Sequence, residues 1–137
     1  MPSSDRPYLL LVPAERVPQV KDRVAPVLAD PTGRRAWRWE EYEPALTRGE
    51  LQLWLIGSGE ELLAALLTEL AKRPQGLVGV IRFIAGAHRD RWLHLLPALE
   101  AWFRARGCVE AHCWARRGWE RLLGDWKKTH ILLEKRL

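Results

Sequence analysis

The stretch that decides the fold is Leu77–Gly107, which reads LVGVIRFIAG, then AHRDRW, then LHLLPALEAWFRARG. It begins with an apolar, β-branched run (Leu77–Ile84), continues through a short polar connection, and ends in an amphipathic pattern. A strand that feeds a helix through a short connection is half of a βαβ unit. The helix is indicated by six large apolar residues that recur at helical spacing and share one face: Trp92, Leu95, Leu96, Leu99, Trp102 and Phe103.

Local signals mark the ends of this helix. We expect Asp90 to be the N-cap, because its carboxylate can accept a hydrogen bond from a free first-turn amide. Gly107 is expected just beyond the C-terminal end, where glycine adopts a positive φ at little cost. Pro97 falls inside the pattern, removes one helical hydrogen bond, and is expected to bend the helix axis.

Length and composition predict one globular domain over residues 1–137, since 137 residues with 47% hydrophobic side chains can bury a core. No apolar run reaches the ~18–20 residues that cross a bilayer. The first residues do not resemble a signal peptide, because their apolar stretch is too short. Cys108 and Cys113 fall at odd spacing on an expected strand, so they should face opposite sides and not bridge. We therefore expect a protein made in a reducing cytoplasm.

The charge is +5 overall and unevenly distributed. Residues 1–81 hold 10 basic and 11 acidic side chains, whereas residues 82–137 hold 12 basic and 6 acidic ones, a net charge of +6. A basic half is typical of a phosphate-bearing partner, either nucleic acid or a cofactor, but also of an arginine-rich solvated surface. Of the eight tryptophans, most should be in the core and some at an interface with other proteins or a second copy.

The patterns predict about six strands and about four helices. The expected strands are Tyr8–Val12, Leu51–Ile56, Glu61–Lys72, Leu77–Ile84, Cys108–Ala115 and Thr129–Lys135. The expected helices are Glu15–Ala29, Trp39–Leu46, the one from Asp90 to Gly107, and Gly118–Leu123. The run Glu61–Lys72 favours helix by propensity, but it lies between two tight turns, so we assign it as a strand.

This order places antiparallel strands first and a βαβ crossover later. It predicts an α/β (α+β) fold with a mixed, mostly antiparallel central sheet of about six strands, flanked by about four helices.

The order of elements resembles that of the GNAT superfamily, the acyl-CoA-dependent N-acetyltransferases. In sequence the resemblance is clearest over Leu96–Trp126, LPALEAWFRARGCVEAHCWARRGWERLLGDW, and the closing THILLEKRL is similar to the family's last strand. The pattern GCxxxxxxxRRGWERxL also resembles a compact version of the fold found among phage and prophage proteins.

The resemblance implies a loop, Gln/Arg-x-x-Gly-x-Gly/Ala, whose amides at a helix N-terminus bind the pyrophosphate of acetyl-CoA. Counting back from Gly107, the leading position falls on Ala87 and the two small positions on Asp90 and Trp92. Asp90 would place a negative charge beside the phosphates, and Trp92 would fill space that the backbone must leave open. The residues that remain as candidates for acetyl-CoA are the strand-edge backbone of Phe83 and Ile84 with Gly86, His88, Arg89 and Arg91.

The resemblance also implies a tyrosine early in the last short helix, which protonates the leaving thiolate. The matching residue is Trp119, and an indole N–H cannot act as that acid. The general base varies within the family. Glu69 and Glu110 are the candidates here because they lie on strands near the expected cleft, but nothing singles out either residue, and a solvated or ion-paired role is the commoner one for such a carboxylate.

Other constellations predict less. No pair of residues has zinc-ligand spacing, so no metal site is expected. His112 and Cys113 are neighbours on a strand and point oppositely, which disfavours a Cys–His nucleophile. The basic pair Arg116–Arg117 between Trp114 and Trp119 could stack on single-stranded nucleic acid, or reflect an alternation of core and surface.

Two hypotheses follow. The first is a non-catalytic GNAT-like protein of phage or prophage type that serves as a structural, virion-associated (internal or ejection-type) component, with other proteins as partners. The second is an active acetyl-CoA-dependent N-acyltransferase with an altered pyrophosphate loop. The second predicts an open gap between the fourth and fifth strands, and a tryptophan at position 92 that filled this gap would argue against it.

Overall fold

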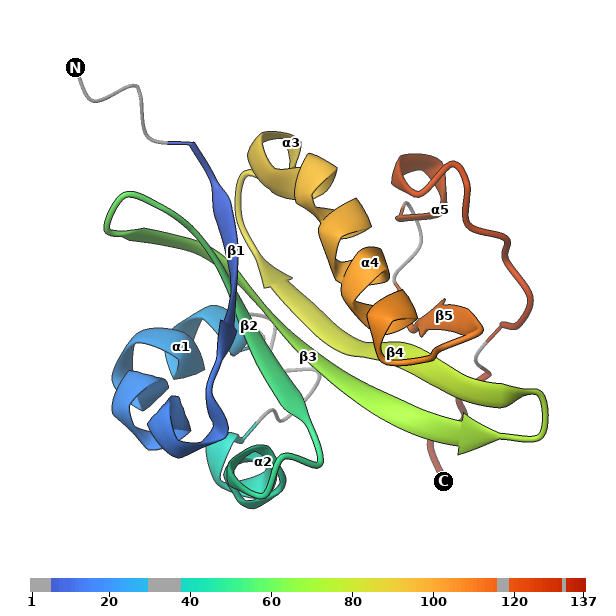
Figure 1. Ribbon diagram of the computed structural model, residues 1–137, viewed down its shortest axis with the longest axis horizontal. Helices are drawn as coiled ribbons and strands as arrows, with labels where there is room; N and C mark the ends of the chain where they lie inside the picture. Colours follow the sequence, from blue (N-terminus) through green and yellow to red (C-terminus); the bar gives the residue numbers. More distant parts are fainter. Residues whose placement is uncertain (1–5, 30–37, 116–118, 132) are drawn as a thin grey trace.

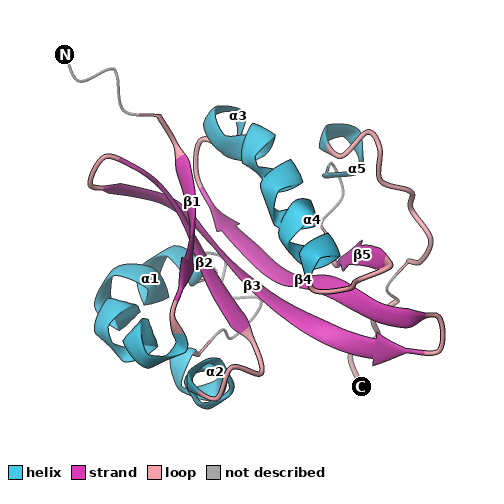
Figure 2. Cartoon of the chain, viewed as in Figure 1, coloured by secondary structure: helices cyan, strands magenta, loops and turns pink. Residues whose placement is uncertain are grey.

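The computed structural model describes residues 6–29, 38–115, 119–131 and 133–137. One strand and a group of helices come first, followed by three consecutive antiparallel strands and then a helical crossover to the last strand (Figure 2). In chain order they are β1 (Tyr8–Val12), η2 (Ala14–Val20), α1 (Lys21–Leu28), α2 (Trp39–Thr47), β2 (Gln52–Ser58), β3 (Glu61–Arg73), β4 (Gly76–Gly86), α3 (Arg89–Trp92), η3 (Leu93–Leu95), α4 (Leu96–Ala105), β5 (Glu110–Cys113) and α5 (Trp119–Leu122).

The five strands form one sheet in the order β1-β2-β3-β4-β5 (Figure 1). The first four are antiparallel, and β5 lies parallel to β4 after the helical crossover. The predicted mixed, mostly antiparallel sheet is therefore confirmed, and so is the strand assigned to Glu61–Lys72. Residues Leu63 to Leu67 of β3 are buried on both faces of the sheet, because a helical layer covers each face. That two-sided burial outweighs the helix propensity of the run.

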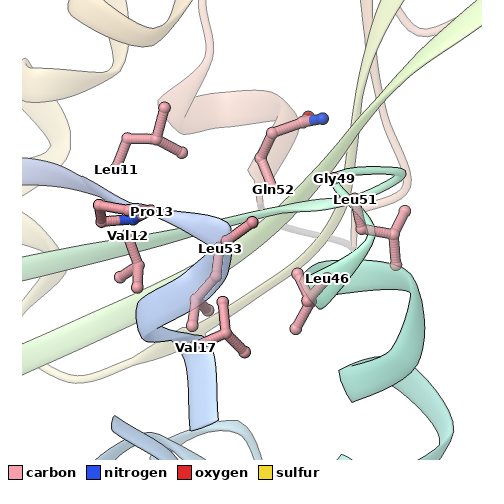
Figure 3. Close-up of a pocket in the computed structure, with 10 residues that line it drawn as sticks. Leu11, Val12, Pro13, Val17, Leu46, Gly49, Leu51, Gln52 and Leu53 are labelled. Atoms are coloured by element: carbon pink, nitrogen blue, oxygen red, sulfur yellow. The ribbon is translucent and has the colours of Figure 1, made fainter. Parts of the chain in front are cut away.

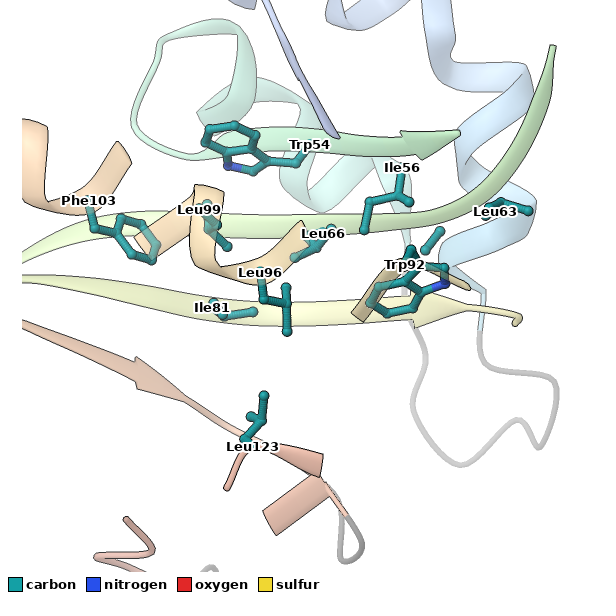
Figure 4. Packing of buried hydrophobic residues seen from close by; sticks show 11 residues of the cluster. Trp54, Ile56, Leu63, Leu66, Ile81, Trp92, Leu96, Leu99, Phe103 and Leu123 are labelled. Carbon is teal, nitrogen blue, oxygen red and sulfur yellow. The ribbon is translucent and has the colours of Figure 1, made fainter. Parts of the chain in front are cut away.

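One face of the sheet packs against η2, α1 and α2. Its core includes Val17, Leu28, Trp39, Leu46 and Leu53. The opposite face packs against α3, η3 and α4, and Leu123 after α5 contributes to the same core (Figure 4). The members of this second cluster shown in Figure 4 come from both the sheet and the helices: Trp54, Ile56, Leu63, Leu66, Ile81, Trp92, Leu96, Leu99, Phe103 and Leu123.

A buried polar group lies inside this second layer. The Thr68 side chain is fully buried, and its hydroxyl accepts a hydrogen bond from the Trp54 indole N–H at 3.0 Å. The same hydroxyl donates to Gln52 Oε1 at 2.8 Å. The hydroxyl is therefore satisfied both as donor and as acceptor, as a buried polar group requires.

The crossover helix differs from the prediction at its beginning. It is divided into α3, the 3-10 turn η3 and α4, rather than being one helix. Asp90 is not the N-cap, because helix α3 already begins at Arg89; the capping position is His88, with φ 58°, and its side chain makes no capping bond. Pro97 does not bend a continuous helix: it lies in the first turn of α4, where its missing N–H leaves no helical bond unmade. Gly107 has φ 89° after α4, as predicted.

Gly79 sets the distance between β4 and α4. A Cβ atom at this position would overlap the Phe103 ring, lying 2.6 Å from its Cδ2. The bare backbone lets the ring lie directly on the strand, so a glycine is required here for packing rather than for a turn.

The last predicted strand is wrong for the residues that the structure describes. Thr129–Ile131 and Leu133–Lys135 have no strand structure, so the sheet has five strands rather than about six. The helix predicted over Glu15–Ala29 is present as two pieces, η2 and α1. Cys108 precedes β5 instead of belonging to it, and it packs with Cys113 against the same cluster; both thiols are free. No helix in the described part of the chain has the length and apolar character to span a membrane.

Candidate functional site

The candidate site lies where β4 and β5 stop pairing. The β4–β5 ladder begins with Val78 opposite Glu110 and ends with Ile81 opposite Cys113. Beyond this point β5 has ended, and β4 continues to Gly86. Figure 1 shows β4 running on past the end of β5 toward α3. The two strands therefore separate beyond Ile81.

A β-bulge coincides with this separation. Leu67 of β3 pairs with Phe83, but the next residue, Thr68, pairs with Ile81, so Arg82 is an extra residue in β4. A bulge bends its strand and increases the local twist. The bulge at Arg82 therefore lies directly after the last residue of β4 that pairs with β5.

The residues predicted for the cofactor lie along the end of β4 and the loop after it. Phe83 packs against the α1/α2 core and Ile84 against the α4 core, so the two side chains face opposite layers. Gly86 ends the strand with φ 152°, and a Cβ there would overlap the backbone of β3. Beyond it, the basic side chains of the loop are exposed: His88, Arg89 and Arg91.

Two tryptophans and Arg89 connect the two sides of the separation. The Arg89 guanidinium lies over the Trp119 ring of α5, 5.1 Å from its centroid. The Trp119 and Trp92 rings are 6.3 Å apart and tilted by 38°. The contacts therefore run from α3, which follows β4, to α5, which follows β5.

Trp92 lies on the buried helical face that its spacing predicted, with Leu96, Leu99 and Phe103. Its side chain is 1% exposed in the core between α3 and the sheet, and its indole N–H donates to the Ala87 carbonyl at 2.8 Å. Arg91, one residue earlier in α3, is exposed. The half-buried Trp119 indole contacts the exposed Arg89 side chain.

The two candidate bases are not brought together with this loop. Glu110 pairs with Val78 at the closed end of the ladder, where its carboxylate contacts His112 Nε2 at 2.8 Å and Gln75 Nε2 at 3.5 Å. Those two hydrogen bonds, His112 first, lower the pKa of Glu110 and keep it ionised, which makes it a poor proton acceptor. Glu69 lies opposite Val80 and is paired with Arg82 at 3.4 Å, beside the bulge.

Two ion pairs in this region were not predicted, and only one of them could have been read from the sequence. The Arg82–Glu69 pair depends on the bulge, for which the sequence carries no signal. The Glu110–His112 pair could have been found, since residues two apart on a strand share a face. Cys113, the last paired residue of β5, is a poor nucleophile because burial raises the pKa of its thiol to about 11. The described residues contain no group of three side chains suited to a metal ion.

A pocket of about 130 Å³ lies elsewhere, between the end of β1, η2, the end of α2 and the start of β2 (Figure 3). Its wall is apolar, with Leu11, Val17, Leu46 and Leu53 around it and the Gln52 amide as its polar side chain. It contains no titratable side chain, so it offers no group for acid–base chemistry.

Comparisons with known proteins support the fold. No family model and no curated protein matches the chain by sequence. An aminoglycoside acetyltransferase, meta-AAC0020, from an uncultured soil metagenomic sample superposes with a TM-score of 0.69 at 10% identity, covering 96% of each chain. A GCN5-related N-acetyltransferase from Ralstonia eutropha JMP134 gives 0.68 at 19% identity, covering 94% of this chain and 97% of the other. A predicted acetyltransferase from Clostridium acetobutylicum, solved with acetyl-CoA, gives 0.67 at 14% identity, with 95% and 96% covered. The chain therefore has the fold of the GCN5-related N-acetyltransferase (GNAT) superfamily.

Proposed function

We propose that this chain is a GNAT-fold protein that does not transfer acetyl groups and that acts as a component of a protein assembly. One observation carries the proposal: Arg89 lies on the Trp119 ring, 5.1 Å from its centroid, across the separation of β4 and β5. The Arg89 guanidinium, which is the cation that would bind phosphate, is held against the Trp119 ring instead. By resemblance, Trp119 also stands where the family has its acid, and its indole N–H cannot supply a proton.

The loop itself fits acetyl-CoA poorly. Asp90 is exposed between Arg89 and Arg91 and would repel phosphate. Ala87 has no side-chain donor, and its carbonyl is held by the Trp92 indole. A phosphate-bearing ligand would therefore have to displace Arg89 from Trp119 and lie beside a carboxylate.

Exposed apolar side chains support a role in assembly. Val109 and Trp114, at the two ends of β5, are 60% and 62% exposed. Large exposed apolar residues are typical of surfaces that bind other proteins. Within this proposal, the resemblance of GCxxxxxxxRRGWERxL to phage and prophage proteins favours a virion-associated component, made in the cytoplasm and incorporated into a particle.

The alternative is an active N-acyltransferase, which a specific observation also favours. β4 and β5 separate beyond Ile81, and the exposed loop at that point carries His88, Arg89 and Arg91. The Clostridium acetobutylicum neighbour was solved with acetyl-CoA. For this chain, acetyl-CoA binding remains part of the alternative.

Calorimetry with acetyl-CoA separates the two proposals. We expect no heat of binding for the wild type and no acetylation of simple amines. Micromolar binding that Arg89→Ala weakens, while the control Arg104→Ala at an exposed position of α4 does not, would overturn the non-catalytic proposal. In that case Trp119→Tyr, which restores a phenolic acid, should raise turnover at unchanged affinity.

A further inference from the structure

The pocket between β1, η2, α2 and β2 extends from the surface into the core (Figure 3). Its inner wall is made of core side chains, since Val17, Leu46 and Leu53 are each 1% exposed. Its mouth is at the surface, because Pro13 and Gly49, which also line it, are exposed. A small molecule can therefore enter from solvent and lie against the core that α1 and α2 form with the sheet.

The walls of this pocket are already held in place. The backbone N–H groups of Glu50 and Leu51 both donate to the Ala45 carbonyl, at 2.9 and 3.3 Å, and fix the connection from α2 to β2. On the surface of that connection, the Arg48 guanidinium pairs with the Glu50 carboxylate at 2.8 Å. The inner side chains belong to a close-packed core and resist moving into the space. Small-molecule sites are usually preformed in this way.

The chemistry of the wall selects the kind of ligand. Its polar side chain is Gln52, whose Oε1 already accepts a hydrogen bond from the Thr68 hydroxyl at 2.8 Å. An ordered water needs two to four polar partners, and the side chains of this wall offer little beyond that amide. A charged ligand would lose its hydration without gaining an ion pair, because none of the described residues that line the pocket is titratable. The wall therefore favours a neutral, apolar molecule over water or an ion.

The volume sets the size of this molecule. The pocket measures about 130 Å³, and an engineered apolar cavity of about 150 Å³ in another protein binds benzene. We propose that the pocket binds one small neutral apolar molecule, of the size of a benzene ring or a short alkyl chain.

This site is separate from the loop after β4. Gly86, at the end of β4, pairs with Ala64 of β3, which pairs with Ile56 near the end of β2. The pocket instead contacts Gln52 and Leu53, at the beginning of β2. The inference therefore does not depend on whether the loop after β4 binds acetyl-CoA.

The test is a titration of the full-length wild type with benzene, followed by NMR of labelled leucine and valine methyl groups. The methyl signals of Val17, Leu46 and Leu53 should shift, because a bound aromatic ring changes the local magnetic field. The shifts should saturate below the solubility limit of benzene. The methyl signals of Leu96 and Leu99, in the opposite layer, should stay unchanged. Benzoate, which adds a carboxylate to the same ring, should give no saturable shift.

Matched variants locate the binding. Ala14→Leu enlarges a half-buried side chain of the pocket wall and should weaken benzene binding at least tenfold. Ala101→Leu makes the same change at an exposed position of α4 and should leave the affinity unchanged.

Three results would overturn the proposal: no saturable shift in the wild type, equal shifts in both layers, or benzene binding that Ala14→Leu leaves unchanged. The wild-type titration decides by itself if Ala14→Leu does not fold. None of these measurements involves acetyl-CoA, so this inference and the proposed function fail independently.

Discussion

The contact between Gly79 and Phe103 allows a sharp test of how β4 and α4 pack. A Cβ added at Gly79 would lie 2.6 Å from Cδ2 of Phe103, and still closer to two other ring atoms. The ring is 2% exposed and has packed neighbours, so it cannot move aside without disturbing the core. Overpacking of this kind costs about 1–3 kcal/mol. We expect Gly79→Ala to lower the free energy of unfolding by that amount and the melting temperature by roughly 3–5 °C per kcal/mol.

Urea denaturation of matched variants measures this cost. Gly124→Ala is the control, because a Cβ there would meet no atom within 4 Å. Gly79→Ala combined with Phe103→Leu should be more stable than the sum of the two single changes predicts, since the smaller side chain makes room for the methyl group. If Gly79→Ala proves as stable as Gly124→Ala, or if the double variant is strictly additive, the packing described for β4 and α4 is wrong.

Three further predictions concern single side chains. Thr68→Val leaves the Trp54 N–H and Gln52 without their partner and should cost about 1–3 kcal/mol in urea denaturation, whereas Thr68→Ser should retain most of the stability. Cys113 should react slowly with a thiol reagent at pH 8, because a pKa of about 11 leaves roughly one thiol in a thousand ionised. This slow phase of the reaction should be absent in Cys113→Ser, and it should become faster in urea, where the thiol is no longer buried. The pKa of Glu110 in the folded protein is lowered from 4.5, so its contribution to stability is present above pH 4.5 and is lost as the pH falls below that value. Glu110→Gln should therefore make the free energy of unfolding, measured by urea denaturation, less dependent on pH in the acid range. An unchanged pH dependence would contradict this.

The sequence predicted the architecture because most elements carry strong local patterns. The apolar run Leu77–Ile84 and the apolar helical face that follows it predicted the strand and helix of the crossover. The two tight turns on either side of Glu61–Lys72 predicted a strand there in spite of its helix propensity, and the strand is present. The separation of the fourth and fifth strands was predicted only by the N-acyltransferase hypothesis. The extra residue Arg82, at the level where their pairing ends, has no signal in a single sequence.

The errors have physical causes. The crossover helix was predicted in one piece, but the 3-10 turn η3 divides it into α3 and α4, while Trp92 keeps the buried position that its spacing predicted. Asp90 looked like a cap by residue type, but α3 begins one residue earlier, after His88. The strand expected at Thr129–Lys135 was read from a short apolar run, and the residues described there form none, since a strand needs a neighbour with which to pair.

The extra residue in β4 has a consequence for how this chain can change over time. Before Arg82, the residues that face α4 are odd-numbered, as at Gly79 and Ile81; after it they are even-numbered, as at Ile84. Losing or gaining a single residue between Ile81 and Gly86 would send Phe83 and Ile84 into the opposite layers, because the two faces of a strand alternate strictly. An insertion or deletion there is therefore more disruptive than a substitution of similar size, so homologues should be aligned through this segment by its length rather than by residue identity.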